Sequence, residues 1–114
     1  MSVPVPWRQV VVEQLQMLAS DREQLAYEEN VPHVDITAEL VCGWFDDSYH
    51  PDDSDFCICF TEVELAALAE FNTLYDERTK RLPKSNGTIK TWLASPTWRE
   101  VMSAASKTLD RVAA

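Results

Sequence analysis

Ten consecutive residues near the middle of the chain carry the side chains best suited to chemistry. The stretch DDSYHPDDSD, residues 46–55, holds five aspartates and one histidine without any Lys or Arg, and Cys57 and Cys59 follow directly. Carboxylates at this density can hold a metal ion, act as an acid–base pair, or present negative charge to a basic partner. Each of these chemistries requires a particular spacing of residues.

The spacing does not fit a calcium loop. If Asp53 takes the first position of such a loop, Glu64 falls at the twelfth, where a bidentate ligand belongs. The sixth position is then Ile58 instead of the glycine that permits the sharp turn, and the fifth is Cys57, a soft ligand for a hard cation. We therefore expect no calcium site.

A zinc site is not expected either. Zinc needs four well-placed nitrogen or sulfur ligands, and only His50, Cys57 and Cys59 lie close together in the sequence, with Cys42 farther back. A C-x-C pair inside the apolar run FCICF is more typical of two small buried side chains. The sequence thus predicts no bound metal.

Catalysis finds equally little support. His33 and His50 are the only histidines, and two glycines in the whole chain leave no glycine-rich phosphate loop. The neighbouring pairs Asp46-Asp47 and Asp52-Asp53 would work as acid and base only if their environments separated their pKa values, whereas runs of this kind are usually solvated. We expect neither an enzyme nor a cofactor.

A binding surface is the remaining chemistry. The segment from Trp44 to Tyr49 interleaves aromatic side chains with carboxylates, a composition that can combine a desolvated aromatic anchor with a charged rim. The alternative is that Trp44 and Phe45 belong to the core and that the aspartates only keep the protein in solution. Both interpretations stay open at this stage.

The distribution of charge favours a basic protein as the partner. The net charge is −9, and no Lys or Arg occurs between Arg22 and Arg78, although residues 23–77 carry fifteen acids. From Arg78 onward, eight basic residues face two acids. Such an acidic segment repels phosphates and attracts positive surfaces, so we expect no nucleic acid as a partner.

Length and composition predict one folded domain over residues 1–114. The chain is 46% hydrophobic and contains four Trp, enough apolar surface for a core of its own. Three cysteines argue against a disulfide framework, and no run of about 18 apolar residues or signal-like start is present. We expect a soluble cytoplasmic protein without membrane contact, either a monomer or a weak homodimer.

The elements that would position these residues are mainly helices. A helix is expected from near Pro6, and Ser20 with Glu23 indicates either a second start or one continuous helix to about residue 29, before Val31-Pro32 ends it. Residues 34–45 fit both a helix capped by Asp35 and a strand, and we favour the helix.

The second half of the chain gives clearer signals. Thr61 with Glu64 forms a capping box for a long helix that ends before Pro83. A turn at residues 85–87, a short helix after Thr88 and a C-terminal helix from Ser95-Pro96 complete the prediction. We therefore predict an all-α or mostly α bundle of about five helices, with α+β as the alternative if residues 34–45 and 56–60 form a short sheet.

Three runs of the sequence resemble a known family. ELVCGWFDDSYHP, FTEVELAALAEFN and SPTWREV are similar to small bacterial proteins with a W-F-D-D-x-Y-x-P pattern, the immunity proteins of polymorphic toxin systems, including contact-dependent growth inhibition. The resemblance spans about residues 37–110. Its matching positions are Trp44, Phe45, Asp46, Asp47, Tyr49, Pro51, Phe60, Glu64, Leu65, Leu68, Phe71 and Trp98. It implies an antitoxin that docks on a cognate secreted toxin domain, often a basic nuclease.

Charge pattern and resemblance together predict the residues that contact the partner. They are Glu39, Asp46, Asp47, Tyr49, Asp52, Asp53 and Asp55. On this hypothesis an acidic face covers the positive cleft of a toxin, while a few aromatic residues supply affinity. The competing hypothesis is an acidic protein-interaction or regulatory module without a toxin, which could form a homodimer through its basic C-terminal segment.

Overall fold

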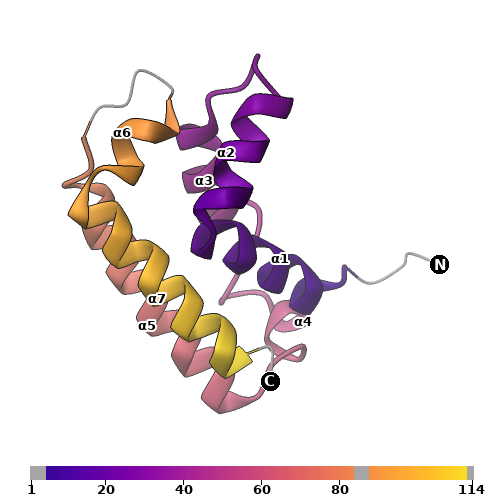
Figure 1. Cartoon of the computed structure of the whole chain (residues 1–114). Helices are drawn as coiled ribbons and strands as arrows, with labels where there is room; N and C mark the ends of the chain where they lie inside the picture. The colour runs from indigo at the N-terminus through magenta and orange to yellow at the C-terminus, as the bar shows by residue number, and fades with distance from the viewer. Residues whose placement is uncertain (1–4, 84–87, 113–114) are drawn as a thin grey trace.

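The computed structural model describes residues 5–83 and 88–112, and helices are the only regular secondary structure in these two ranges (Figure 1). Five helices have ten or more residues, and two are short. In chain order they are α1 (Trp7–Ala19), α2 (Asp21–Asn30), α3 (Ile36–Phe45), α4 (Ser54–Cys57), α5 (Glu62–Thr79), α6 (Ile89–Leu93) and α7 (Pro96–Val112). The predicted all-α bundle is confirmed. None of the described helices combines the length and the apolar character needed to cross a bilayer.

Side-chain caps set the starts of the helices at the predicted positions. The Asp35 carboxylate accepts hydrogen bonds from the backbone N–H groups of Thr37 and Ala38, which begins α3. Thr61 and Glu64 form the complete capping box of α5. Ser20 accepts from the Glu23 N–H, so the chain restarts as α2 instead of continuing as one long helix.

The alternative sheet is wrong at both of its proposed segments. Residues 34–45 become α3, because Asp35 supplies the first turn with an acceptor. Residues 56–60 form the end of α4 and a turn. Phe56 and Phe60, four positions apart, both point into the core, while the Ile58 side chain between them is 81% exposed. The predicted turn at residues 85–87 lies outside the described residues.

Helix α7 packs against α1, α5 and α6, and together with α5 it forms one side of the molecule (Figure 1). Two ion pairs show how α5 runs beside α7. Arg78 pairs with Glu100, and Glu70 pairs with Arg111. The end of one helix therefore lies beside the start of the other, and the pair is antiparallel (Figure 1). The short helix α4 lies near the first turn of α1.

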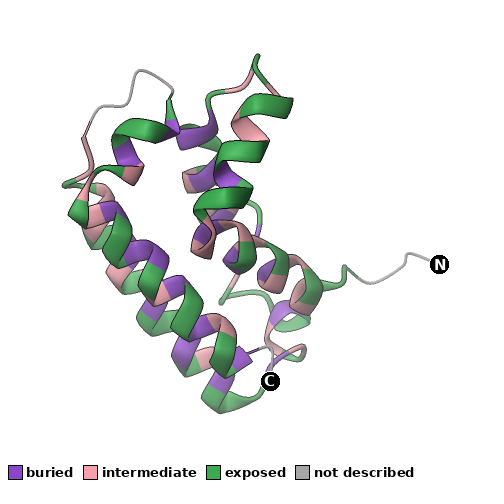
Figure 2. Ribbon diagram, in the orientation of Figure 1, coloured by how far each residue is buried: buried purple, intermediate pink, exposed green. Residues whose placement is uncertain are grey.

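Buried side chains from every described helix except α2 form one hydrophobic cluster, and the partly buried Tyr27 of α2 packs against it (Figure 2). The largest fully buried members are Trp44, Trp98, Tyr75 and Phe56. On α5 and α7 the exposed residues lie on the outer faces, and the buried ones face inward. A core of this aromatic content leaves little freedom in how the helices pack.

Polar side chains inside the core link the helices to one another. Gln24 is fully buried, donates to the carbonyl oxygens of Met17 and Leu18 at the end of α1, and accepts from the Trp98 indole N–H at 3.0 Å. Tyr75 donates its hydroxyl to the Leu40 carbonyl at 3.1 Å, which joins α5 to α3. Each contact satisfies a buried polar group; those of Gln24 join α2 to α1 and α7, and that of Tyr75 holds α3 in position.

Candidate functional site

The arginines of the chain are mostly engaged in ion pairs within the fold. Of the six arginines, only Arg22 has no carboxylate within ion-pair distance among the described residues. The partner acids lie on α2, α5 and α7, and they are Asp21, Glu64, Glu70, Glu77 and Glu100. The arginines from Arg78 onward thus neutralise carboxylates that lie on the helices of their own chain.

The carboxylates of the predicted site are left out of this pairing. Within residues 5–83 and 88–112, none of them makes an ion pair, and every one of them is exposed. These residues are Glu39, Asp46, Asp47, Asp52, Asp53 and Asp55. The segment from α3 to α4 therefore keeps its negative charge uncompensated in the folded protein.

The structure brings part of the predicted site together in a groove. A cavity of about 360 Å³ opens between α1, α2 and α3, and Glu39 and Asp47 line it. Glu13 of α1 lies in the same lining, although the sequence analysis did not include it. Three carboxylates from two helices and one loop thus share one concave surface.

Three carboxylates on or next to α3 lie close enough to the Cys42 thiol to change its pKa. Partial loss of solvent raises its pKa, and the nearby charges of Asp46, Glu39 and Asp47 raise it further. Asp46 is also the residue that ends α3, where the helix dipole is negative, and Asp47 follows it. Negative charge at a helix C-terminus is unfavourable, so these two aspartates do not stabilise the helix that carries them.

The remaining predicted residues form a second, separate group. Tyr49, Asp52 and Asp53 line an open concavity of about 370 Å³ together with His50. Burial, followed by the neighbouring Cys57 and Asp52, raises the pKa of the Tyr49 hydroxyl. Asp55 does not line this concavity, and no described cavity unites all seven predicted residues.

Asp53 has a structural role of its own. Its carboxylate accepts a hydrogen bond from the Asp55 N–H at 2.8 Å and caps the start of α4. Asp35 acts in the same way at α3, where its hydrogen bonds with Thr37 and Ala38 lower its pKa. These two aspartates stabilise helix starts, in contrast to Asp46 and Asp47.

The aromatic residues of the segment belong to the core, so the interpretation of Trp44 as an exposed anchor is wrong. Trp44 is fully buried, donates its indole N–H to Asn72, and lies parallel to the Tyr49 ring at 5.2 Å between ring centroids. Phe45 is half-buried against Tyr75. A partner can therefore reach only the outer parts of Phe45 and Tyr49, and no part of Trp44.

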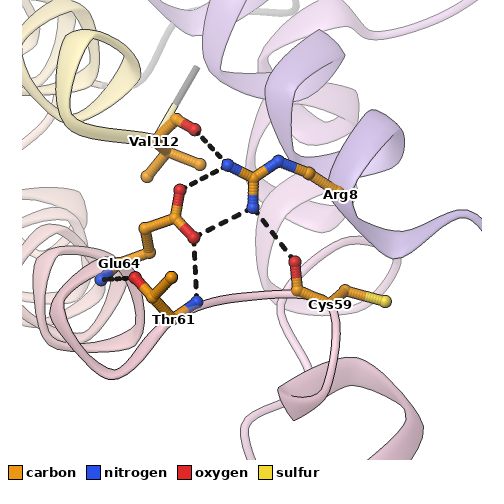
Figure 3. Close-up of polar contacts among 5 residues, drawn as sticks. All are labelled: Arg8, Cys59, Thr61, Glu64 and Val112. Atoms are coloured by element: carbon orange, nitrogen blue, oxygen red, sulfur yellow. Dashed lines mark hydrogen bonds and ion pairs between the residues drawn. The ribbon is translucent and has the colours of Figure 1, made fainter. Parts of the chain in front are cut away.

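Glu64, the last ligand of the rejected calcium alignment, is committed to a different role. Its carboxylate pairs with the Arg8 guanidinium and accepts the Thr61 N–H, while Arg8 also donates to the carbonyl oxygens of Cys59 and Val112 (Figure 3). The hydrogen bond from Arg8 is the main cause that lowers the pKa of Glu64 to about 2. This network joins α1, α5 and the end of α7.

Sequence reasoning missed the contribution of α1 to the groove. Val10, Glu13, Gln14 and Met17 all line it, and their spacing of three, one and three places them on one side of a helix. The signal was present in the helical periodicity. What the sequence could not indicate is that this side of α1 packs beside α3.

Metal geometry and comparisons with known proteins add no further assignment. Across residues 5–83 and 88–112, no three side chains of His, Cys, Asp or Glu are arranged to hold a metal ion. No family model, curated protein or solved structure matches the chain. The resemblance to immunity proteins therefore remains a prediction from the sequence.

Proposed function

We propose that this protein is a cytoplasmic immunity protein that binds and neutralises a cognate secreted toxin. Because the binding surface is acidic, we propose that this toxin is a basic nuclease. The acidic segment of the immunity protein from α3 to α4 would cover the positive surface with which such a toxin grips phosphate. A nuclease needs that surface for its own substrate, so an anionic protein seated on it competes directly.

One observation carries the proposal. The six exposed carboxylates of the predicted site have no ion-pair partner among the described residues, while five arginines are used elsewhere in the fold. Uncompensated like charges repel one another, and a positively charged partner relieves that repulsion on binding. Such a field also raises the rate at which oppositely charged proteins meet.

The competing module without a toxin receives less support from the same contacts. A homodimer in which the basic C-terminal segment meets the acidic segment of its mate needs free cations. Arg78, Arg99 and Arg111 already pair with carboxylates of their own chain. Only the lysines of the described C-terminal segment, such as Lys90 and Lys107, remain outside an ion pair.

Coproduction with a candidate toxin tests the proposal. The gene directly preceding this one should encode a large secreted protein, whose C-terminal portion is called the toxin domain below. We expect that the toxin domain alone arrests growth of a bacterial host and that coproduction of this protein restores growth. Unrelieved arrest, or a preceding gene of another kind, would contradict the proposal. A salt-sensitive homodimer in sedimentation would then favour the module without a toxin.

A further inference from the structure

The floor of the groove between α1, α2 and α3 is apolar. Its volume of about 360 Å³ lies at the small end of the range of about 300–1,000 Å³ for binding pockets. The apolar side chains that line it are Val10, Met17, Tyr27, Ile36 and Leu40. Ile36 and Leu40 are buried and fixed by the core, whereas Met17 is flexible and adapts to the shape of what it contacts.

The rim of the groove is anionic. Glu13, Glu39 and Asp47 line it and are exposed, and no Lys or Arg occurs in the described lining. Glu13 accepts one neutral hydrogen bond, from the Gln9 amide at 3.0 Å, and none of the three carboxylates makes an ion pair within the described ranges. An anionic ligand would therefore be repelled.

Glycine at position 43 allows the groove its present shape. A Cβ at this position would lie 2.9 Å from the Gln14 Nε2 atom, so the Gln14 side chain would have to move. Gln14 is held only weakly, since its amide reaches the Leu40 carbonyl at 3.5 Å. Glycine inside a helix costs about 1 kcal/mol relative to alanine, and a Cβ here would displace only the end of the flexible Gln14 side chain.

An apolar floor with a carboxylate rim matches one kind of side chain. Arginine and lysine have an apolar stem and a cationic head, so the stem can lie on the floor while the head reaches the rim. We propose that the groove receives an arginine or lysine of a basic amphipathic segment of the toxin domain. This inference rests on the proposed function and makes the groove the contact point, with Asp52, Asp53 and Asp55 acting only at long range.

A small molecule tests the chemistry of the groove without the toxin. In ¹⁵N NMR spectra of the full chain, n-hexylguanidinium chloride should shift the amide signals of residues 10–17 and 36–48. Guanidinium chloride and hexan-1-ol each carry one half of the probe, and both should bind about tenfold more weakly. Equal shifts with hexan-1-ol, or shifts centred on α4, would overturn the inference.

Narrowing the groove provides a variant without any change of charge. In Gly43→Ala the new methyl group displaces Gln14, and we expect several-fold weaker binding of n-hexylguanidinium. Stability should stay the same or rise, because alanine is the better helix former. Unchanged affinity of the probe in a variant that melts at or above the wild-type temperature would count against the groove as the binding place.

Two matched triple variants separate this inference from the proposed function. The groove triple is Glu13→Gln, Glu39→Gln and Asp47→Asn, and the α4 triple is Asp52→Asn, Asp53→Asn and Asp55→Asn. Each removes three negative charges, and asparagine still caps α4 at position 53. We expect the groove triple to weaken binding of the toxin domain at least about tenfold more than the α4 triple does.

Two other results of the binding measurement on the triple variants would contradict one proposal or the other. Equal losses in the two triples would leave only long-range attraction, so the groove inference would fail while the proposed function stands. Unchanged affinity in both would contradict the proposed function itself. Thermal unfolding of both triples checks folding, and all six positions are exposed and free of ion pairs among the described residues.

Discussion

The α5–α7 pair and the segment from α3 to α4 use their charges in opposite ways. Between α5 and α7, Arg78 and Arg111 each meet a carboxylate of the facing helix. From α3 to α4, six exposed carboxylates meet no cation among the described residues, and Asp46 and Asp47 oppose the dipole of α3. Folding thus neutralises one region and leaves the other charged, so net charge along the sequence is a poor guide to charge on the surface.

Within the acidic segment, some residues have a role in the fold and others are available to bind a partner. Trp44 is inside the core and Asp53 caps a helix, so both have a role in the folded chain without any partner. Glu39, Asp46 and Asp47 are exposed, and among the described residues they make no ion pair and cap no helix start. If the two regions differ as described, substitutions should divide into those that change stability and those that change binding.

The largest expected effect is that of Trp44→Ala. Removing a fully buried indole that also donates to Asn72 should lower the free energy of unfolding by about 3–5 kcal/mol. Urea denaturation followed by tryptophan fluorescence or circular dichroism measures the loss. A loss below about 1 kcal/mol would mean that Trp44 is an exposed anchor and that the division between core and surface is wrong here.

Glu64→Gln should give the next largest effect. Glutamine preserves the capping box but removes the charge that pairs with Arg8, and we expect a loss of about 2–3 kcal/mol at neutral pH. The Arg8 side chain is 43% exposed, which keeps the loss below that of a fully buried pair. Glu77→Gln is the control, since its pairs with Arg78 and Arg81 are at the surface and contribute less than about 1 kcal/mol.

The pH dependence of the same variant gives an independent check. The pKa of Glu64 is about 2 in the folded protein, below the ordinary value of 4.5. The folded state therefore favours the charged form, and its stabilisation is fully present above about pH 5 and is lost as the pH falls toward 2. Wild type and Glu64→Gln should converge in unfolding free energy over this range. A constant difference from pH 7 to pH 2 would contradict the assigned role of the Arg8 pair.

How much of this was available from the sequence depends on the range of the interaction. The caps at Asp35 and Thr61 were predicted correctly, because a cap and the N–H groups it accepts lie within three residues. The burial of Gln24 was not, because its partner Trp98 is 74 positions away. The same limit hid Glu13, whose place beside the acidic segment depends on how α1 packs against α3.

The run FCICF shows that a short hydrophobic pattern does not by itself decide between strand and helix. Alternation of apolar residues fits a strand, and the same letters place Phe56 and Phe60 on one face of a helical turn. The helical cap at Asp53 decides between them, since it accepts the N–H of the residue two positions on and starts α4. Local capping chemistry therefore outweighs a five-residue hydrophobic pattern here.

The smallest expected effect on stability comes from the charged end of α3. Asp46→Asn with Asp47→Asn removes two anions from a helix C-terminus, and we expect the free energy of unfolding to rise by about 0.5–1 kcal/mol. Chemical denaturation at low ionic strength resolves a change of this size. The control is Asp35→Ala, which removes a favourable cap and should lower stability by about 1 kcal/mol. If both variants lost stability, Asp46 and Asp47 would be structural residues.

The central claim is that the uncompensated carboxylates attract a positively charged partner, and the salt dependence of association tests it most directly. The association rate constant with the purified toxin domain can be measured by stopped flow between about 20 mM and 500 mM NaCl. The account predicts a steep fall with salt for the wild type and a shallow one when Glu39, Asp46, Asp47, Asp52, Asp53 and Asp55 are all made neutral. Equal salt dependence in the two proteins would contradict it.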